Sequence, residues 1–410
     1  MAISRYGIRT PPDADDIIER CRRSSRLIQG PDIEAFERAF ERRLGQGSVV
    51  ATSYGRMAFY HLLKALGLPA GSEIVVPALT FWVIPELARS AGLRPVFADV
   101  DPQTFTIDPA SLERAITPHT SAIVPTHLYG LPCDMEAVMS IARRRGLAVI
   151  EDCAHALGAT YRGQPVGTFG DAALFSFQTL KPLNAFGGGA AVIRDEAVAR
   201  RVRDQVAALP WPSEKRIANR FKVAGAMRFF TRPAVFTMTG FPILWVCSWF
   251  NDWSPDVYLW EPIRQLNPLP EPYLERFPNV QAAVALAGLS RLDAWTAATQ
   301  AHASVMNDAL TGLSGVQVPA VPDGCTHVYY QYCVYTPNRD KAVARSVRRG
   351  VDIETLHVDV CPELEVFADL GPAPAPGAAR ACDAIQIPVY ASLTDRQIAR
   401  VARVVRRVVR

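Results

Sequence analysis

Short apolar segments alternate with longer amphipathic segments through most of the first half of the chain. The short segments are about four to seven residues long and rich in Val and Ile, which favours β-strands, whereas the longer ones repeat apolar residues at helical spacing. Strands are expected at 73–77, 94–100, 121–124, 147–152, 172–177 and 188–193. This alternation predicts an α/β fold with a mostly parallel central sheet and helices on both of its faces.

The remaining segments extend this core at both ends. Residues 12–46 are predicted to form two helices separated at Gly30-Pro31, and 194–210 a further helix. Beyond residue 276 the sequence predicts one long helix over 277–310, a β-rich piece at 326–337, a helix at 339–349 and a terminal helix after Thr394. We therefore expect a large domain over 1–210, an insertion over 211–275 and a smaller C-terminal α+β domain over 276–410.

The insertion is rich in Pro and aromatic residues. Its segment Ala234–Phe250 has no charged residue, yet it is interrupted by Gly240 and Pro242 and is shorter than the roughly 20 residues that cross a bilayer. A buried or interface-covering insertion is the simplest interpretation. Contact of residues 225–262 with a membrane surface or a lipid-like substrate is the alternative.

Composition excludes several classes of protein. With 410 residues, 49% of them hydrophobic and 20% charged, the chain is globular and not disordered. Its net charge of +4 owes much to the basic C-terminal helix, which we interpret as a solvated face because no nucleic-acid-binding motif accompanies it. The eight cysteines form no CxxC pair, so neither a disulfide framework nor a metal site is expected. The N-terminus lacks an apolar signal region, which predicts a cytoplasmic protein.

The candidate chemistry lies within residues 151–193. Asp152 ends one expected strand, and Lys181 follows another inside a run with no other charge. Burial lowers the pKa of a lysine amine and favours its use in imine chemistry. Pyridoxal phosphate needs such a lysine for its Schiff base and a carboxylate that keeps its pyridine nitrogen protonated. The alternatives are a surface lysine and an aspartate that caps the following helix.

A phosphate site is expected where Gly55 begins a helix. The free backbone N–H groups of Gly55, Arg56 and Met57 can face an anion, and the helix dipole favours a phosphate there. The hydroxyl of Ser176, on the strand that leads to Lys181, can donate a hydrogen bond to the same phosphate. Alternatively, Ser176 is only a polar strand residue, and most helices that begin with glycine bind nothing.

Two motifs resemble a known family. The run EDCAHALGA (151–159), followed by G-x-F-G-D-x-A-x-F-S-F-x-x-x-K (167–181), is similar to the DegT/StrS family of sugar aminotransferases. Further pieces such as VPALTFWVIPEL, PVFADVDPQTFTID, NVQAAVALAGL and IPVYASLT occur in the family order and extend the resemblance over most of the chain. The resemblance implies pyridoxal phosphate and the fold of type I enzymes that use it.

The resemblance also implies a role for individual residues. Lys181 would form the Schiff base, Asp152 would hold the pyridine nitrogen, and His155 would hydrogen-bond the ring hydroxyl. Phe81 would stack on the cofactor ring, while Ser176 and the amides of Arg56 and Met57 would bind the phosphate. A residue of the partner subunit completes this phosphate site in the family. The resemblance therefore implies a homodimer in which Arg276 reaches the partner's phosphate.

The chain departs from the family at three positions. Gly55-Arg56 stands where Gly-Thr is usual, so a hydroxyl is lost and a cation gained. Arg276 stands where the partner subunit usually supplies an asparagine. Gly187 replaces the glutamate of the usual Glu-Gly-Gly, which, together with the aromatic insertion, weakens the expectation of an ordinary nucleotide-sugar substrate.

The expected function is that of an aminotransferase. An amino donor, glutamate by family resemblance, would give its amino group to the keto group of a sugar-like or cyclitol-like acceptor, with Lys181 moving the proton. A dehydrating subgroup of the family has histidine in place of this lysine. The alternatives are a lyase, decarboxylase or condensing enzyme acting on an amphipathic substrate with the same cofactor, and a regulator that binds the cofactor without turnover.

Overall fold

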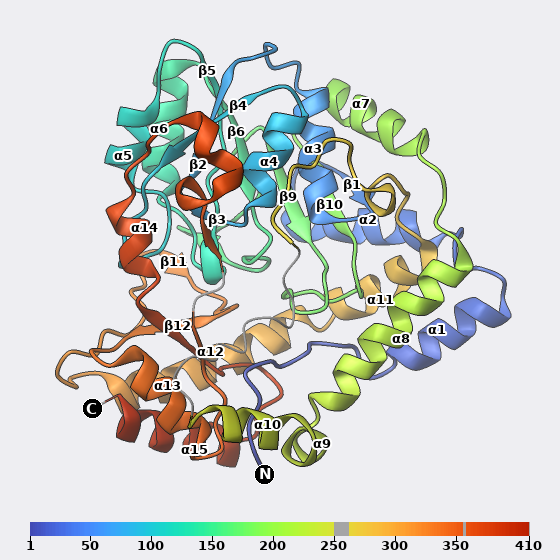
Figure 1. The fold of residues 1–410 in the computed structure, drawn as a ribbon. Helices are drawn as coiled ribbons and strands as arrows, with labels where there is room; N and C mark the ends of the chain where they lie inside the picture. The colour runs from blue at the N-terminus through green and yellow to red at the C-terminus, as the bar shows by residue number, and fades with distance from the viewer. Residues whose placement is uncertain (250–261, 356–357, 410) are drawn as a thin grey trace.

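A seven-stranded sheet forms the centre of the protein, which was studied as a computed structural model describing residues 1–249, 262–355 and 358–409. The strands in spatial order are β1 (Ser48–Thr52), β10 (Gly189–Ile193), β9 (Ala172–Ser176), β6 (Ala148–Asp152), β5 (Thr120–Ile123), β2 (Glu73–Pro77) and β4 (Arg94–Ala98). β10 runs antiparallel to both of its neighbours, and the other four neighbouring pairs are parallel. The predicted mostly parallel sheet is confirmed (Figure 1).

Helices cover both faces of the sheet, as alternation along each strand requires. Val50 and Leu174 pack on α3 (Gly55–Ala65), α4 (Val83–Ser90) and α7 (Glu196–Ala207), whereas Val49 and Phe175 pack on the opposite side against α2 (Asp32–Leu44) and α11 (Asn279–Leu289). The helices α5 (Pro109–Ala115) and α6 (Met135–Arg145) cover the end of the sheet near β4. Asp108 caps α5 by accepting hydrogen bonds from the amides of Ala110 and Ser111.

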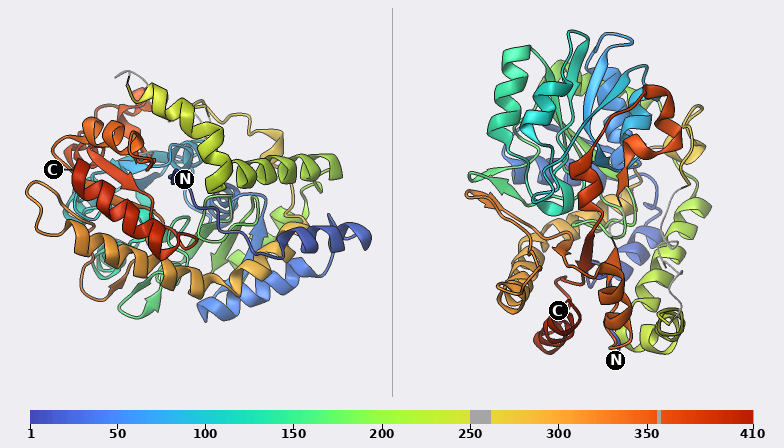
Figure 2. Two further views of the ribbon diagram at one scale, coloured as in Figure 1. Left: turned by 90° about the horizontal axis from the view of Figure 1, so that it is seen from below. Right: turned by 60° about the vertical axis from the view of Figure 1, so that its left-hand side comes forward.

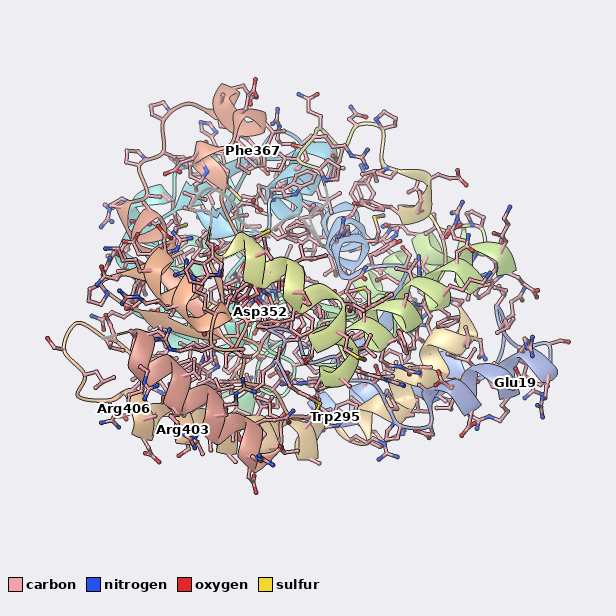
Figure 3. The ribbon with its side chains drawn as sticks, turned by 60° about the horizontal axis from the view of Figure 1, so that its bottom comes forward. Glu19, Trp295, Asp352, Phe367, Arg403 and Arg406 are labelled. Atoms are coloured by element: carbon pink, nitrogen blue, oxygen red, sulfur yellow. The ribbon has the colours of Figure 1, made fainter. Side chains whose placement is uncertain are left out.

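A second body is built by the C-terminal part of the chain (Figures 1 and 2). Its core is formed by α12 (Leu292–Leu310), α13 (Arg339–Val347) and α15 (Asp395–Val408), which pack on the sheet β12 (Tyr332–Tyr335), β15 (Ala384–Ile387) and β13 (Glu354–Thr355). The basic residues Arg403 and Arg406 point away from this core on the outer side of α15, in agreement with a solvated face (Figure 3).

The expected single helix over 277–310 is wrong. The structure has two helices, α11 and α12, separated at Ser290 and Arg291. The two helices serve different bodies, because α11 packs on α2 beside the central sheet and α12 packs on α15. Residues on both sides of Ser290 and Arg291 favour helix, so the sequence alone shows no break. The chain changes direction there because α11 and α12 pack on different bodies.

Packing crosses the expected domain boundaries in three places. Ile3 belongs to the core of the C-terminal body, α11 belongs to the core beside the central sheet, and Cys361 with Phe367 returns to the core under α4. The division at residues 210 and 275 stays a prediction.

The shorter elements are α1 (Ala14–Arg23), β3 (Leu79–Thr80), η1 (Leu128–Gly130), β7 (Thr160–Tyr161), β8 (Gln164–Pro165), η3 (Glu271–Tyr273), β11 (Cys325–Thr326), β14 (Asp359–Val360), η4 (Cys361–Glu363), η5 (Glu365–Leu370) and α14 (Pro376–Ala381).

The described part of the insertion contains the α-helices α8 (Glu214–Phe230), α9 (Pro233–Met238) and α10 (Gly240–Cys247), which lead from the large body to the C-terminal one (Figure 1). Phe236 and Leu244 pack there against Ala2 and Val347. Residues 250–261 of the predicted insertion lie outside the described residues. Within the described chain, no helix is both long and apolar enough to cross a membrane.

Three backbone segments meet where α3 begins. A Cβ atom on Gly189 would lie 2.2 Å from the amide nitrogen of Gly55, and one on Gly55 would lie 2.8 Å from the carbonyl oxygen of Phe175. Both distances are shorter than carbon can approach backbone atoms. Glycine at both positions therefore lets α3 begin directly on the ends of β9 and β10.

Gly189→Ala should destabilise the protein by about 2–3 kcal/mol, because the new methyl group meets backbone that cannot move aside. The measurement is the free energy of unfolding from urea denaturation. Gly225→Ala in α8 is the matched control, since a Cβ there meets nothing within 4 Å, and should stabilise the protein by about 0.5–1 kcal/mol. Equal effects of the two substitutions would contradict the close approach.

Candidate active site

A cavity of about 240 Å³ opens at the carboxyl ends of β6 and β9, where ligands of parallel sheets bind. Because these strands are parallel neighbours in the sheet, the residues that follow them come together. The cavity is lined by Tyr6, Tyr54, Gly55, Arg56, Thr80, Phe81, Ile84, Thr126, Leu128, Asp152, Ala154, His155, Leu174, Ser176, Gln178, Leu180, Lys181, Tyr330, Gln331 and Val358. Seven of the predicted site residues are among them.

Asp152 presents a buried carboxylate to this cavity from the last position of β6. It is 5% exposed, and its Oδ1 accepts a hydrogen bond of 2.9 Å from the amide of Ala154. Among the described residues no donor bonds to Oδ2, which leaves this oxygen to a ligand. Burial raises the pKa of Asp152, while the Ala154 amide and the charge of Lys181 lower it. The residues after Asp152 form a turn and not a helix, so helix capping does not explain the aspartate.

Lys181 lies in the loop after β9 and faces the same cavity. Its Nζ atom lies 5.0 Å from the centre of the Tyr330 ring. Burial lowers the pKa of Lys181 to about 8, Asp152 opposes this change, and the positive charge of Arg56 adds to it. A substantial fraction of the amine is therefore neutral near pH 8, which is the form that attacks a carbonyl carbon.

The start of α3 supplies only part of the predicted phosphate site. Gly55, Arg56 and Ser176 line the cavity. Met57 does not, because its side chain is buried in the core and its amide donates to the carbonyl oxygen of Tyr54 at 3.0 Å. The Arg56 guanidinium lies over the rings of Phe81 and Tyr273 and donates to the Tyr273 hydroxyl.

Phe81 and His155 both line the cavity. Phe81 follows β3 and lies beneath the Arg56 guanidinium. The His155 ring stacks on the Tyr330 ring with 4.1 Å between centres, and its Nδ1 accepts a 3.4 Å hydrogen bond from the Tyr129 amide. Burial, with a smaller contribution from the charge of Lys181, holds the pKa of His155 well below its usual value. His155 is therefore neutral at pH 7.

Arg276 does not line the cavity of its own chain. Its guanidinium stacks on the Trp211 ring at 4.1 Å, and its amide donates to the carbonyl oxygen of Pro210. The predicted role of Arg276 concerns the phosphate site of a partner subunit. A single chain leaves that role a prediction.

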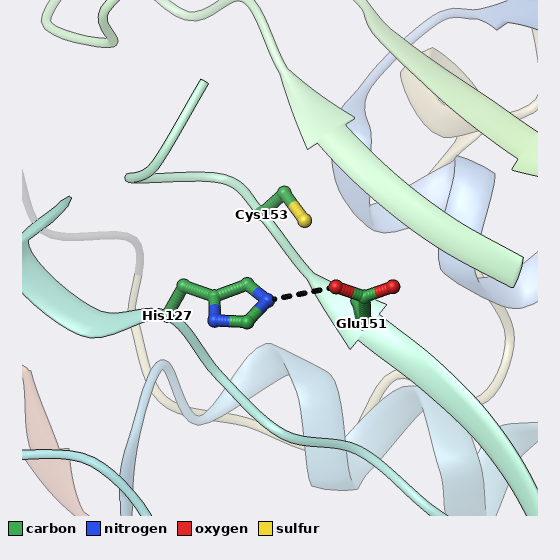
Figure 4. Close-up of side chains that lie close together, drawn as sticks. All are labelled: His127, Glu151 and Cys153. Atoms are coloured by element: carbon green, nitrogen blue, oxygen red, sulfur yellow. Dashed lines mark hydrogen bonds and ion pairs between the residues drawn. The ribbon is translucent and has the colours of Figure 1, made fainter. Parts of the chain in front are cut away.

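His127, Glu151 and Cys153 lie close enough together to suggest a metal site beside the cavity (Figure 4). His127 Nδ1 accepts the Cys133 amide at 3.0 Å, so the proton on Nε2 faces Glu151 at 3.1 Å. Glu151 also accepts the amides of Gly167, Phe169 and Gly170. These contacts give His127 a structural role, because they tie the residues after β5 and before β9 to the end of β6.

Sequence reasoning missed several residues of the cavity wall. Tyr6 comes from the N-terminal segment, Tyr54 precedes α3, and Tyr330 with Gln331 precedes β12. Tyr330 is placed because the amides of Val328 and Gln331 donate to the carbonyl oxygens of Gly130 and Tyr129. The aromatic run at 328–335 was the available signal, but nothing in the sequence separated its cavity-facing member from its core members.

The cavity residues fit pyridoxal phosphate. The open Oδ2 of Asp152 suits a pyridinium N–H, and the Lys181 amine faces the same space. Ser176 and Arg56 add a hydroxyl and a cation at the start of α3, where an anion is favoured. Gly187, where a family glutamate was expected, has φ of +130°, and a Cβ there would lie 3.0 Å from Gln281 Nε2. Glycine suits this backbone.

The pKa of Lys181 predicts the pH dependence of its reactivity. In cofactor-free protein, the rate at which unphosphorylated pyridoxal adds to Lys181 should rise with pH and reach half its maximum near pH 8, because only the neutral amine reacts. Arg56→Met removes a like charge, raises the pKa of Lys181 and should move this midpoint to higher pH. The measurement is visible absorbance against pH, with Lys181→Ala as the unreactive control. An unmoved midpoint in Arg56→Met would contradict the electrostatic coupling.

Comparison with known proteins agrees with this geometry. The model of the DegT/DnrJ/EryC1/StrS aminotransferase family matches residues 12–226 and 272–406. A dTDP-3-amino-3,4,6-trideoxy-alpha-D-glucose transaminase of Micromonospora megalomicea subsp. nigra is 32% identical, over 97% of this chain and 95% of the relative. A pleiotropic regulatory protein of Geobacillus stearothermophilus is also 32% identical, over 94% and 91%.

Solved structures give the same result. The crystal structure of DesV from S. venezuelae in complex with a ketimine intermediate superimposes with a TM-score of 0.76 at 29% identity, covering 96% of this chain and 94% of DesV. The family model leaves out residues 227–271, which contain α9, α10 and the end of α8. The chain therefore belongs to the DegT/DnrJ/EryC1/StrS aminotransferase family and is a pyridoxal-phosphate-dependent aminotransferase.

Proposed function

We propose that this aminotransferase moves an amino group from an amino acid, with glutamate as donor, to the keto group of a sugar-like or cyclitol-like acceptor. The observation that carries the proposal is the meeting of the Lys181 amine and the Asp152 carboxylate in one cavity at neighbouring strand ends. The related dTDP-amino-sugar transaminase supports the choice of acceptor class.

The bound cofactor supplies an electron sink that stabilises negative charge next to the transferred nitrogen. Asp152 holds the pyridine nitrogen protonated through its open Oδ2. Lys181, with a pKa of about 8, accepts and returns the transferred proton as a general base and acid near neutral pH. His155, neutral and fixed by Tyr129 and Tyr330, hydrogen-bonds the ring hydroxyl. Phe81 packs on the ring, and Ser176, Arg56 and the amides at the start of α3 bind the phosphate.

Glutamate should bleach the visible absorption band of the purified protein and yield one equivalent of 2-oxoglutarate per site. Lys181→Ala should lose the band and lower turnover by about a thousandfold or more, because both the covalent link and the proton carrier are removed. Absorption spectroscopy and product analysis make the measurement, with Lys64→Ala, an exposed lysine on α3, as control.

A bound cofactor that no amino acid converts would contradict the aminotransferase proposal. That outcome would favour a regulator, the function in the name of one relative, or another reaction of the same cofactor on an amphipathic substrate. Persistence of the band in Lys181→Ala would show that another lysine carries the cofactor.

The active unit we propose is a homodimer in which Arg276 reaches the phosphate of the partner's cofactor. Arg276 lies two residues before Pro278, which is the N-cap of α11. Its guanidinium stacks on Trp211, so contacts within its own chain hold its position. A guanidinium binds phosphate with two parallel hydrogen bonds. A solution mass of one chain in sedimentation experiments on the active enzyme would contradict this arrangement.

We further propose that the insertion contacts an anionic membrane surface. Its described helices expose Phe229, Phe230, Met238, Ile243, Trp245, Val246 and Trp249. Exposed cations complement anionic headgroups here: Lys222 and Arg232 of the insertion, Arg345 of α13, and Arg349 shortly after α13. α10 packs against the end of α13 through Leu244 and Val347. The rest of the predicted segment 225–262, at 250–261, lies outside the described residues.

The wild-type protein should cosediment with phosphatidylglycerol vesicles, and the double variant Ile243→Ser/Trp245→Ser should not. Equal recovery of the wild type in the pellet with and without these vesicles would contradict the proposal.

A further inference from the structure

A second, smaller cavity adjoins the first. Its volume is about 60 Å³, and it shares Tyr6, Leu180, Tyr330 and Gln331 with the wall of the larger cavity. Its remaining wall is formed by the N-terminal segment 5–9, by Glu354 of β13, and by the end of β15 with the residues that follow it. Tyr330 therefore lines both cavities, and the centre of its ring lies 5.0 Å from the Lys181 Nζ atom.

Two buried hydrogen-bond donors of this small cavity have no partner among the described residues. They are Nη1 of Arg9 and Nε2 of Gln386. The other terminal nitrogen of Arg9 donates to Thr299 Oγ1 at 2.9 Å, which fixes the guanidinium. Gln386 is 5% exposed, and its backbone is held in the sheet between β12 and β13. An unsatisfied buried donor destabilises a fold, so two of them in one cavity indicate a ligand that accepts hydrogen bonds.

The neighbouring acids do not serve as partners of Arg9. Asp352 and Glu354 are both engaged by Arg5, at 2.7 Å and 3.0 Å, and Glu354 also accepts the Tyr6 hydroxyl at 2.5 Å. Among the described residues, no carboxylate lies within ion-pair distance of Arg9. Burial lowers the pKa of Arg9 to about 10, so the side chain remains a cation at neutral pH.

A carboxylate matches this cavity better than a neutral group. A guanidinium with a free N–H next to an amide N–H offers two donors and one positive charge, which is what a carboxylate accepts. The small volume suits a carboxylate and its attached carbon, not a nucleotide or a sugar ring. The position, one tyrosine ring away from Lys181, suits a molecule whose amine must meet the cofactor.

We propose that Arg9 and Gln386 form the binding site for a carboxylate group of the amino donor. The donor's amine then lies in the larger cavity with Lys181, and its carboxylate lies in the smaller cavity. The site rests on the proposed transamination from an amino acid. It gives the N-terminal segment, which sequence reasoning left without a function, a role in choosing the donor.

Arg9→Met should raise the dissociation constant for glutamate in the first half-reaction by about 10- to 100-fold, the range of a lost hydrogen bond to a charged group. Gln386→Leu should raise it by about 3- to 10-fold, as expected for a neutral donor. The measurement is the stopped-flow rate of loss of the visible band against glutamate concentration. The KM for the keto acceptor and the visible spectrum of the resting enzyme should stay unchanged. Arg143→Met, an exposed arginine on α6, is the matched control.

Calorimetric titration of the holoenzyme with glutarate, which has the carboxylates but no amine, tests the site apart from turnover. Binding in the wild type that is lost in Arg9→Met, with Arg9→Lys intermediate, would support the site even if glutamate proved unable to donate its amine. Any of three results would overturn the proposed site. Glutarate could bind equally to wild type and Arg9→Met, it could bind to neither, or Arg9→Met could change only the KM for the acceptor. Impairment with glutamate but not alanine would place the side-chain carboxylate at Arg9, and impairment with both would place the α-carboxylate there.

Discussion

The site depends on two opposite charges that the sheet holds at neighbouring strand ends. Asp152 and Lys181 lie 29 positions apart in the chain, but β6 and β9 are adjacent and parallel, so both residues reach one cavity. Burial alone would favour the neutral form of each, and each charge partly offsets this effect for the other. The balance leaves an amine that is easily deprotonated beside a carboxylate with one open oxygen, which are the two groups that the cofactor requires.

Close backbone contacts and buried hydrogen bonds around Asp152 and Lys181 hold the ends of the neighbouring strands together. The glycines at 55 and 189 let α3 begin against β9 and β10, so that a helix N-terminus reaches the cavity. Behind Asp152, the buried Glu151 accepts hydrogen bonds from three amides and from the His127 ring, which fixes the end of β6 to the segment that precedes β9 and to the residues after β5. No metal is needed to account for these contacts. The cavity is then closed by Tyr6 and Tyr330, which come from opposite ends of the chain.

Local signals were sufficient for the sheet and for the residues that follow its strands. The expected strand 73–77 coincides with β2, and Asp152, Lys181 and Phe81, which follow expected strands, line one cavity. His127 also follows an expected strand, but it is not among the cavity residues and bonds Glu151 instead. Contacts between distant segments were not predictable in this way. The junction of α11 and α12 has neither proline nor glycine, and Met57 was drawn into the core because its side chain is apolar. Arg9 shows the same limit, since its unpaired nitrogen is evident only when Thr299 and Gln386 are placed beside it.

The departures from the family pattern become related once the fold is known. Gly187, where a glutamate was expected, adopts φ of +130° next to Arg220, whose guanidinium donates to the Tyr54 hydroxyl and to Gln281 at 2.9 Å each. Tyr54 lines the cavity, and Arg220 belongs to α8, the helix that leads into the insertion. Where the resemblance implies an acidic side chain, the structure thus places a guanidinium delivered by another element. A negative group near Tyr54 would meet attraction from Arg220 where a glutamate would repel it. The departures at Gly187 and Arg56 therefore both bring a positive charge close to Tyr54, since the Arg56 guanidinium also lies over the Tyr54 ring.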